Sequence, residues 1–163
     1  MILNGLSLLE AAPIRDMVPD KRREHGVSYG LAEAGYDIRV KQDVLFRAME
    51  YTGPRVWVDG IGTSGRFALA STIEEFHMPP YLVGVVHDKS TWARRGLSVR
   101  NTVIEPGWRG WLTLELVYDG NGRLEIPAGA GIAQVLFHEV ASPAHYEGKY
   151  QGQEDRPVEA RHD

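Results

Sequence analysis

GWLTLELVYDGNG, residues 110–122, decides the fold class, because it alternates polar and apolar side chains and then ends in turn residues. The alternation predicts a strand with Thr113 and Glu115 on one face and Leu114 and Leu116 on the opposite face. Its DGNG end predicts a hairpin, since DG and NG both supply the positive φ that tight turns require.

Short apolar runs of the same kind lie on both sides of this stretch, with Gly and Pro between them. They read YDIRV (36–40), RVWVDG (55–60), GRFALASTIEEF (65–76), YLVGVVHD (81–88), GLSVRNTVIE (96–105), GRLEIPAG (122–129) and GIAQVLFHEV (131–140). This spacing favours a mainly β sandwich, distorted β-barrel or jelly roll over a sheet that alternates with helices. In YDIRV, Asp37 and Arg39 face away from the apolar side, and we interpret both as structural.

One short helix is expected near the N-terminus, over residues 6–12. Ser7 is the predicted N-cap, with Glu10 as its capping-box partner, and Pro13 ends the helix.

Composition sets the outer limits on function. A chain of 163 residues with 43% hydrophobic content suits a single domain with a real core. The net charge of -4 argues against a nucleic-acid polymer as partner. The absence of cysteine excludes thiolate chemistry, and the six histidines lack HxH or HExxH spacing, so we expect no zinc. No apolar run approaches ~20 residues and no signal segment is evident, so we expect no membrane contact and a cytoplasmic protein.

The C-terminal residues 141–163 are polar, rich in glycine and poorly periodic. Such a tail is usually disordered in isolation. It nevertheless holds Tyr146, Lys149, Tyr150 and Gln153, a mixture of aromatic, cationic and amide groups suited to covering a ligand. We therefore expect a lid that becomes ordered over a bound ligand.

Residues 89–115 hold a set of groups suited to catalysis. Cations and hydroxyls at the front, from Lys89 to Arg94, match phosphate oxygens. At the other end, the strand carboxylate of Glu115 can act as acid or base. The structural alternatives are a turn cap for Ser90 and Thr91, a surface ion pair for Arg94 and an outward strand position for Glu115.

Four segments, in order, resemble the dCTP deaminase branch of the dCTP deaminase and dUTPase superfamily. They are GYDIRV (35–40), GRFALAST (65–72), KSTWARRGL (89–97) with IEPGWRGWLTLEL (104–116), and GKYQGQ (148–153). The resemblance implies a single dUTPase-like nucleotide-binding domain over residues 1–163, mainly β, with residues 141–163 as a C-terminal lid. It also implies a homotrimer with sites at subunit interfaces.

The resemblance further implies hydrolytic deamination of dCTP to dUTP and ammonia, within pyrimidine deoxynucleotide metabolism. Glu115 is then a proton shuttle that needs no metal, Ser90 positions the water, and Arg94 holds the carboxylate or stabilises charge on the ring carbonyl. A Mg2+ ion is expected on the triphosphate, with no protein ligands.

The substrate contacts that the resemblance implies lie between residues 89 and 153. They are Lys89, Ser90, Thr91, Trp92, Ala93, Arg94, Glu105, Thr113, Leu114, Glu115, Gln134, Tyr146, Lys149 and Gln153. We interpret Trp92 and Trp111 mainly as packing residues, whereas Trp108 follows a Pro-Gly turn close to the implied site.

The TLE and PGW strings favour the deaminase over the dUTPase. The segment between Val99 and Pro106 is, however, about two residues shorter than in the deaminases that it resembles, which affects base recognition. Thr102 and Val103 are the nearest equivalents there, and Glu105 stands in place of an aspartate. The alternatives are a dUTP diphosphatase, a bifunctional dCTP deaminase and dUTPase, or a non-catalytic nucleotide-binding regulatory trimer.

Overall fold

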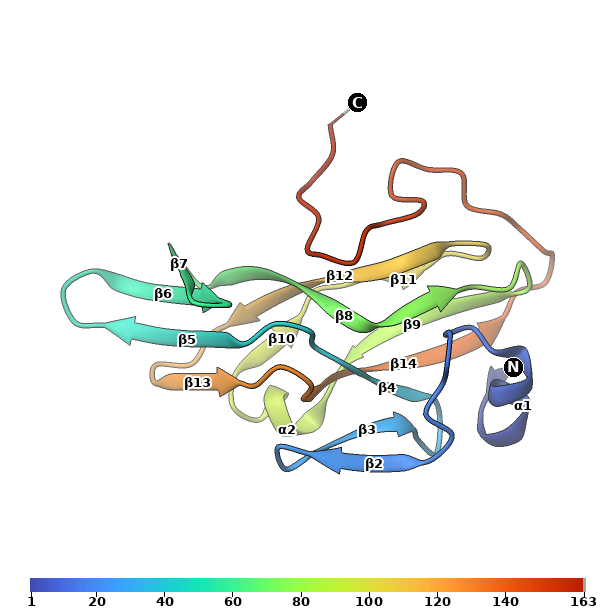
Figure 1. The fold of residues 1–163 in the computed structure, drawn as a ribbon, viewed down its shortest axis with the longest axis horizontal. Coiled ribbons are helices and arrows are strands. Elements are labelled where there is room, and N and C mark those ends of the chain that lie inside the picture. Colours follow the sequence, from blue (N-terminus) through green and yellow to red (C-terminus); the bar gives the residue numbers. More distant parts are fainter. Residues whose placement is uncertain (163) are drawn as a thin grey trace.

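The computed structural model describes residues 1–162, which form fourteen strands in three antiparallel sheets beside two short helices (Figure 1). The helices are α1 (Gly5–Ala11) and α2 (Ser90–Ala93). Neither of them is long and apolar enough to cross a membrane, and residues 1–162 contain no other helix. The mainly β fold with a short N-terminal helix confirms the predicted class.

The first sheet has seven strands in the order β11-β9-β14-β4-β3-β2, with β1 paired to β14. Their bounds are β1 (Ile2–Leu3), β2 (Lys21–Glu24), β3 (Val27–Leu31), β4 (Tyr36–Arg39), β9 (Leu82–Asp88), β11 (Val103–Ile104) and β14 (Gly131–Glu139).

The other two sheets are smaller. The second has the order β10-β12-β8, and its strands are β8 (Phe67–His77), β10 (Leu97–Val99) and β12 (Arg109–Tyr118). The third has the order β13-β5-β6-β7, with β5 (Val44–Met49), β6 (Gly53–Val58), β7 (Ile61–Ser64) and β13 (Arg123–Ile126). In Figure 1 this third sheet lies at one end of the long axis, with α1, β2 and β3 toward the other.

The chain joins the sheets where it crosses from β4 into β5. Val40 forms a bridge with Thr72 of β8, and the backbone N–H of Lys41 donates to the Ser71 carbonyl at 2.8 Å. The Gln42 amide continues this contact, because its Nε2 donates to Ser71 Oγ and its Oε1 accepts from Ser71 N. The sheets are thereby closed around one interior, as in a distorted barrel.

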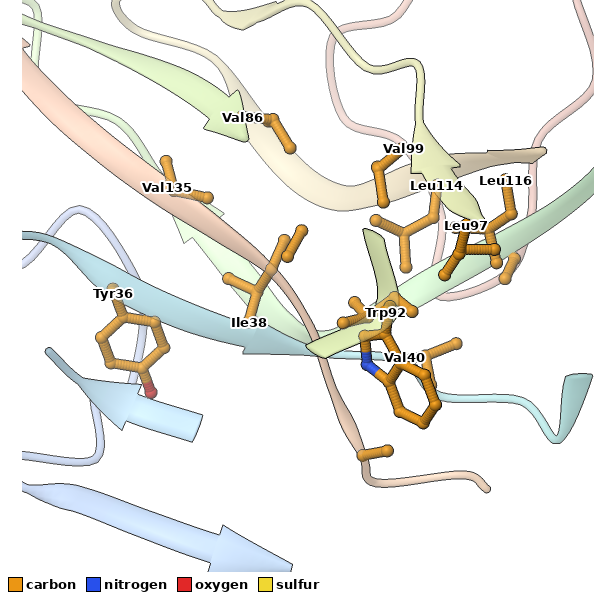
Figure 2. Packing of buried hydrophobic residues seen from close by; sticks show 14 of the residues in the cluster. Tyr36, Ile38, Val40, Val86, Trp92, Leu97, Val99, Leu114, Leu116 and Val135 are labelled. Carbon is orange, nitrogen blue, oxygen red and sulfur yellow. The ribbon is translucent and has the colours of Figure 1, made fainter. Parts of the chain in front are cut away.

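One hydrophobic cluster fills that interior and takes residues from all three sheets. Figure 2 shows part of it, where Ile38, Leu114 and Val135 point inward from strands far apart in the sequence. Trp92 belongs to this cluster, with 4% of its surface exposed, and its Nε1 donates to the Gly131 carbonyl at 2.6 Å. The interpretation of Trp92 as a packing residue is therefore confirmed.

Arg39 is a structural residue, as predicted. Its Nε and its backbone N–H each donate to the buried carboxylate of Glu74 at 2.8 Å. Burial nevertheless raises the pKa of Glu74, because removing the carboxylate from water outweighs the stabilisation that Arg39 gives it.

Two local predictions were wrong in detail. The helix lies where it was expected, but its N-cap is Asn4 rather than Ser7. Its C-cap is Ala12, which has a left-handed φ of 45° before Pro13. Residues 119–122 form no hairpin, because β12 and β13 belong to different sheets. Gly120 is needed there for a close approach, since a Cβ on it would lie 2.3 Å from the Tyr118 ring.

Candidate active site

β12 presents Thr113 and Glu115 on one face, opposite Leu114 and Leu116, as the alternation predicts. Both leucines are fully buried, whereas Glu115 is exposed. Thr113 is buried although it shares a face with Glu115, because Val158 of the C-terminal segment donates its N–H to Thr113 Oγ1. Figure 1 shows this segment passing over β12.

The Glu115 side chain has no hydrogen bond or ion pair with any other residue in 1–162. Its backbone N–H and carbonyl, in contrast, both form hydrogen bonds. The Glu115 N–H donates to Asn101 Oδ1 at 2.9 Å, and its carbonyl accepts from the N–H of Arg100 at 2.8 Å. The carboxylate is therefore available to a ligand while its strand is fixed.

A cleft of about 480 Å³ opens beside Glu115. Strands β8 and β12, the segment that crosses from β10 to β11, and the C-terminal residues all contribute to its walls. The lining residues are Phe67, Leu69, Val86, Asn101, Thr102, Val103, Ile104, Glu105, Trp108, Leu112, Thr113, Glu115, Tyr146, Tyr150, Gln153, Val158, Glu159 and Ala160. This volume lies within the range of small-molecule sites, and the mixture of apolar walls with a few polar groups is typical of them.

The charges in this lining are all negative. Glu105, Glu115 and Glu159 line the cleft, and no Lys or Arg among the described residues does so. Residues 1–162 also contain no group of three or more His, Asp or Glu placed to hold a metal ion. The cleft of a single copy therefore lacks the cations that a triphosphate requires.

The C-terminal segment, residues 141–162, forms the roof of the cleft. Gln153 forms a parallel bridge with Gly110, and its Oε1 accepts from both N and Oγ1 of Thr113 at 3.3 Å. The indole of Trp108 donates to the Tyr150 carbonyl at 2.7 Å. Of the predicted contact residues, Glu105, Thr113, Glu115, Tyr146 and Gln153 thus meet in this cleft.

A second group of predicted residues lies at α2, away from the cleft. Ser90, Thr91 and Arg94 are exposed there, and none of them lines the cleft that holds Glu115. The side chains of Ser90 and Thr91 form no cap on the helix, whose N-cap is Lys89. In Figure 1, α2 lies below β12, whereas most of residues 141–162 lie above β12. The predicted contact of Arg94 with Glu115 is therefore not formed within one chain.

Lys89 is mostly enclosed by its own chain. Its ammonium forms an ion pair with Asp37, of which 3% is exposed, and donates to Ser28 Oγ at 3.0 Å. Ser28 Oγ in turn donates to Asp37 at 2.9 Å. Asp37 is thus structural, as predicted, and Lys89 fixes the start of α2 in this arrangement.

The remaining predicted residues are spread over the fold. Gln134 lies on β14 between His87 and Asp37, and Leu114 points into the core. Ala93 is the last residue of α2. Lys149 lies in the C-terminal segment, 5.7 Å from the ring centroid of Tyr150, and does not line the cleft.

The sequence interpretation missed Asn101 and did not assign a contact to Trp108 or Tyr150. Asn101 occurs in a short polar crossing between two strands, where an amide can replace a backbone partner. That position is the one signal that would have identified it.

Solved structures of low identity share this fold. One is the 2′-deoxycytidine 5′-triphosphate deaminase from Agrobacterium tumefaciens, with a TM-score of 0.59 at 15% identity, covering 85% of this chain and 48% of that chain. Another is a mutant dUTPase from phage phi11 of S. aureus, with a TM-score of 0.53 at 17% identity, covering 79% of this chain and 88% of that chain. The second structure concerns the coordination of a structural Mg(II) ion. The fold is therefore dUTPase-like.

Sequence comparison defines the family more narrowly. A family model described as dCTP deaminase-like matches residues 61–140. The dCTP deaminase of Roseiflexus castenholzii is 36% identical over 162 residues, covering 88% of each chain. The dCTP deaminase of Campylobacter curvus is 39% identical over 148 residues, covering 78% of each. The chain belongs to the dCTP deaminase family of enzymes.

Proposed function

We propose that this protein hydrolyses dCTP to dUTP and ammonia, with the pyrimidine ring bound in the cleft beside Glu115. The observation that carries the proposal is a strand-borne carboxylate without a partner in residues 1–162, at the wall of a cleft of about 480 Å³. Membership of the dCTP deaminase family supports it.

Glu115 would act first as a base and then as an acid. It takes a proton from a water molecule, and the resulting hydroxide adds to C4 of the cytosine ring. The carboxyl group gives this proton to ring N3, then takes the proton of the C4 hydroxyl and passes it to the amino group, so that ammonia leaves with its electron pair as the uracil carbonyl forms. Two hydrogen bonds to its backbone hold Glu115 in place for both transfers.

The cations for the triphosphate would come from a second copy of the chain. The single-copy cleft has three glutamates and no described Lys or Arg in its walls, whereas Ser90, Thr91 and Arg94 lie exposed at α2. A homotrimer with sites at subunit interfaces would bring α2 of one copy to Glu115 of the next. In that site Ser90 positions the water, and Arg94 stabilises the carboxylate or the charge on the ring carbonyl.

The C-terminal segment would close over the bound nucleotide. Tyr146 and Gln153 already line the cleft, and Lys149 follows Tyr146 by three residues. Gln153 Oε1 accepts from N and Oγ1 of Thr113 at 3.3 Å, so the Nε2 group of Gln153 is the donor that would bind a phosphate oxygen. We propose that Lys149 and Gln153 then contact the phosphates.

Magnesium would enter with the substrate. A Mg2+ ion on the triphosphate takes most of its oxygen ligands from phosphates and water, which fits a cleft whose three glutamates form no metal-binding group in residues 1–162. The substrate is then the magnesium complex of dCTP.

The product pattern tests the proposal. Purified protein is incubated with Mg2+ and either dCTP or dUTP, and nucleotides, ammonia and pyrophosphate are each measured. The proposal predicts dUTP and ammonia from dCTP, and no pyrophosphate from either nucleotide. Pyrophosphate release would indicate a diphosphatase or a bifunctional enzyme, and no turnover of either nucleotide would contradict an enzymatic role.

A further inference from the structure

The segment that follows β10 separates from the edge of β12 close to Glu115. β10 pairs with β12 from Leu97 opposite Tyr118 to Val99 opposite Leu116, and Arg100 adds one bond from its N–H to the Glu115 carbonyl. The chain then crosses to the first sheet, where β11 pairs with β9 from Val103 onward. From Glu115 toward Thr113, this edge of β12 therefore has no neighbouring strand.

The side chain of Asn101 takes the place of the missing backbone. Its Nδ2 donates to the Thr113 carbonyl at 2.7 Å, and its Oδ1 accepts from the Glu115 N–H at 2.9 Å. A primary amide has the same donor and acceptor as a peptide group, so it continues the ladder on β12. Only this orientation of the amide satisfies both bonds.

These bonds hold the backbone of Glu115 itself. In an antiparallel strand, the N–H and carbonyl of one residue point to the same side. Both groups of Glu115 point toward the crossing segment, where Asn101 and Arg100 bind them, and away from β8. Because the Glu115 carboxylate has no partner in residues 1–162, the backbone of β12 sets its position, and these two bonds hold that backbone on the side away from β8.

We propose that Asn101 is a positioning residue for proton transfer by Glu115. The inference rests on the proposed deaminase function and assigns to Asn101 no contact with the reacting atoms. Loss of the amide would free the β12 edge from Thr113 to Glu115 and let the carboxylate leave the geometry that both proton transfers require. Displacements of about 1 Å can lower a rate by ~10²-fold.

The test replaces Asn101 by leucine, which keeps the size of the side chain and removes both bonds. Gln42→Leu is the matched control, since it also removes two amide bonds at a crossing between sheets, at a buried site outside the cleft. Asn101→Leu should lower kcat ~10- to 100-fold and change KM for dCTP by less than about threefold. Gln42→Leu should keep the wild-type kcat, although its melting temperature should fall at least as far as that of Asn101→Leu.

Amide hydrogen exchange supplies a readout that does not depend on turnover. The Glu115 amide should exchange at least ~10-fold faster in Asn101→Leu than in the wild type, and at the wild-type rate in Gln42→Leu. Unchanged exchange in Asn101→Leu, or an equal loss of kcat in both variants, would overturn the proposal. A wild-type protein that releases no ammonia would contradict the proposed function alone, and the exchange rates would then decide whether Asn101 holds the strand.

Discussion

The cleft beside Glu115 and the corner around α2 differ in charge. The cleft has three glutamates in its walls and no described lysine or arginine, whereas the corner exposes Arg94 together with two hydroxyls. A triphosphate with a pyrimidine ring needs both kinds of group. We propose that each region supplies part of one site and that a second copy of the chain brings the two parts together.

The two regions also differ in how they are held. The corner is fixed from within, by the pair of Lys89 with Asp37 and by the buried indole of Trp92. Breaking such a buried pair typically costs about 3–5 kcal/mol. The roof of the cleft is held in part through exposed residues, among them Gln151 and Gly152. We therefore expect the corner to be rigid and the roof to open.

The largest predicted effect is that of Glu115→Gln in the cleft. The amide keeps the shape of the side chain and cannot transfer a proton, so kcat should fall on the order of 10³-fold with little change in nucleotide affinity. Ammonia release and calorimetric binding of dCTP measure the two quantities. Glu125→Gln, at an exposed strand position outside the cleft, is the control and should keep full activity. Unchanged turnover in Glu115→Gln would remove this residue from the mechanism.

Truncation after Ala144 should have an intermediate effect. It removes Tyr146, Tyr150 and Gln153 from the cleft, together with the proposed phosphate contacts, so KM for dCTP should rise ~10-fold or more. Steady-state kinetics measure this change, and circular dichroism should show that the strands persist. A truncated protein with the wild-type KM would show that the segment is not a lid.

The smallest predicted effect concerns Ser28, which binds Asp37 and Lys89 beside α2. Ser28→Ala removes one hydrogen bond to Asp37 and one from Lys89, so the free energy of unfolding should fall by about 1–2 kcal/mol while kcat stays the same. Urea denaturation measures the loss, and Ser98→Ala, which removes no side-chain hydrogen bond among residues 1–162, is the control. A change in KM without a loss of stability would show that Lys89 serves the phosphates directly.

The sequence predicted the fold class and the face on which Glu115 lies, because strand periodicity and turn residues are local signals. The prediction of a hairpin at residues 119–122 was wrong because it also rested on a local signal. The DGNG sequence cannot show that the next strand pairs with β5 in another sheet. The pairing of Lys89 with Asp37 joins residues 52 apart in the chain, and that of Asn101 with Glu115 depends on where two sheets separate. Such contacts follow from tertiary structure and leave no periodic pattern.

The central claim is that the site takes Glu115 from one copy and Arg94 from another, and mixing two inactive variants tests it most directly. Glu115→Gln and Arg94→Ala proteins are unfolded together, refolded in equal amounts and assayed for release of ammonia from dCTP. Random assembly into closed rings places an intact Glu115 beside an intact Arg94 at about a quarter of the interfaces. The account therefore predicts recovery to about a quarter of wild-type activity, and a mixture that stays as inactive as its parents would contradict it.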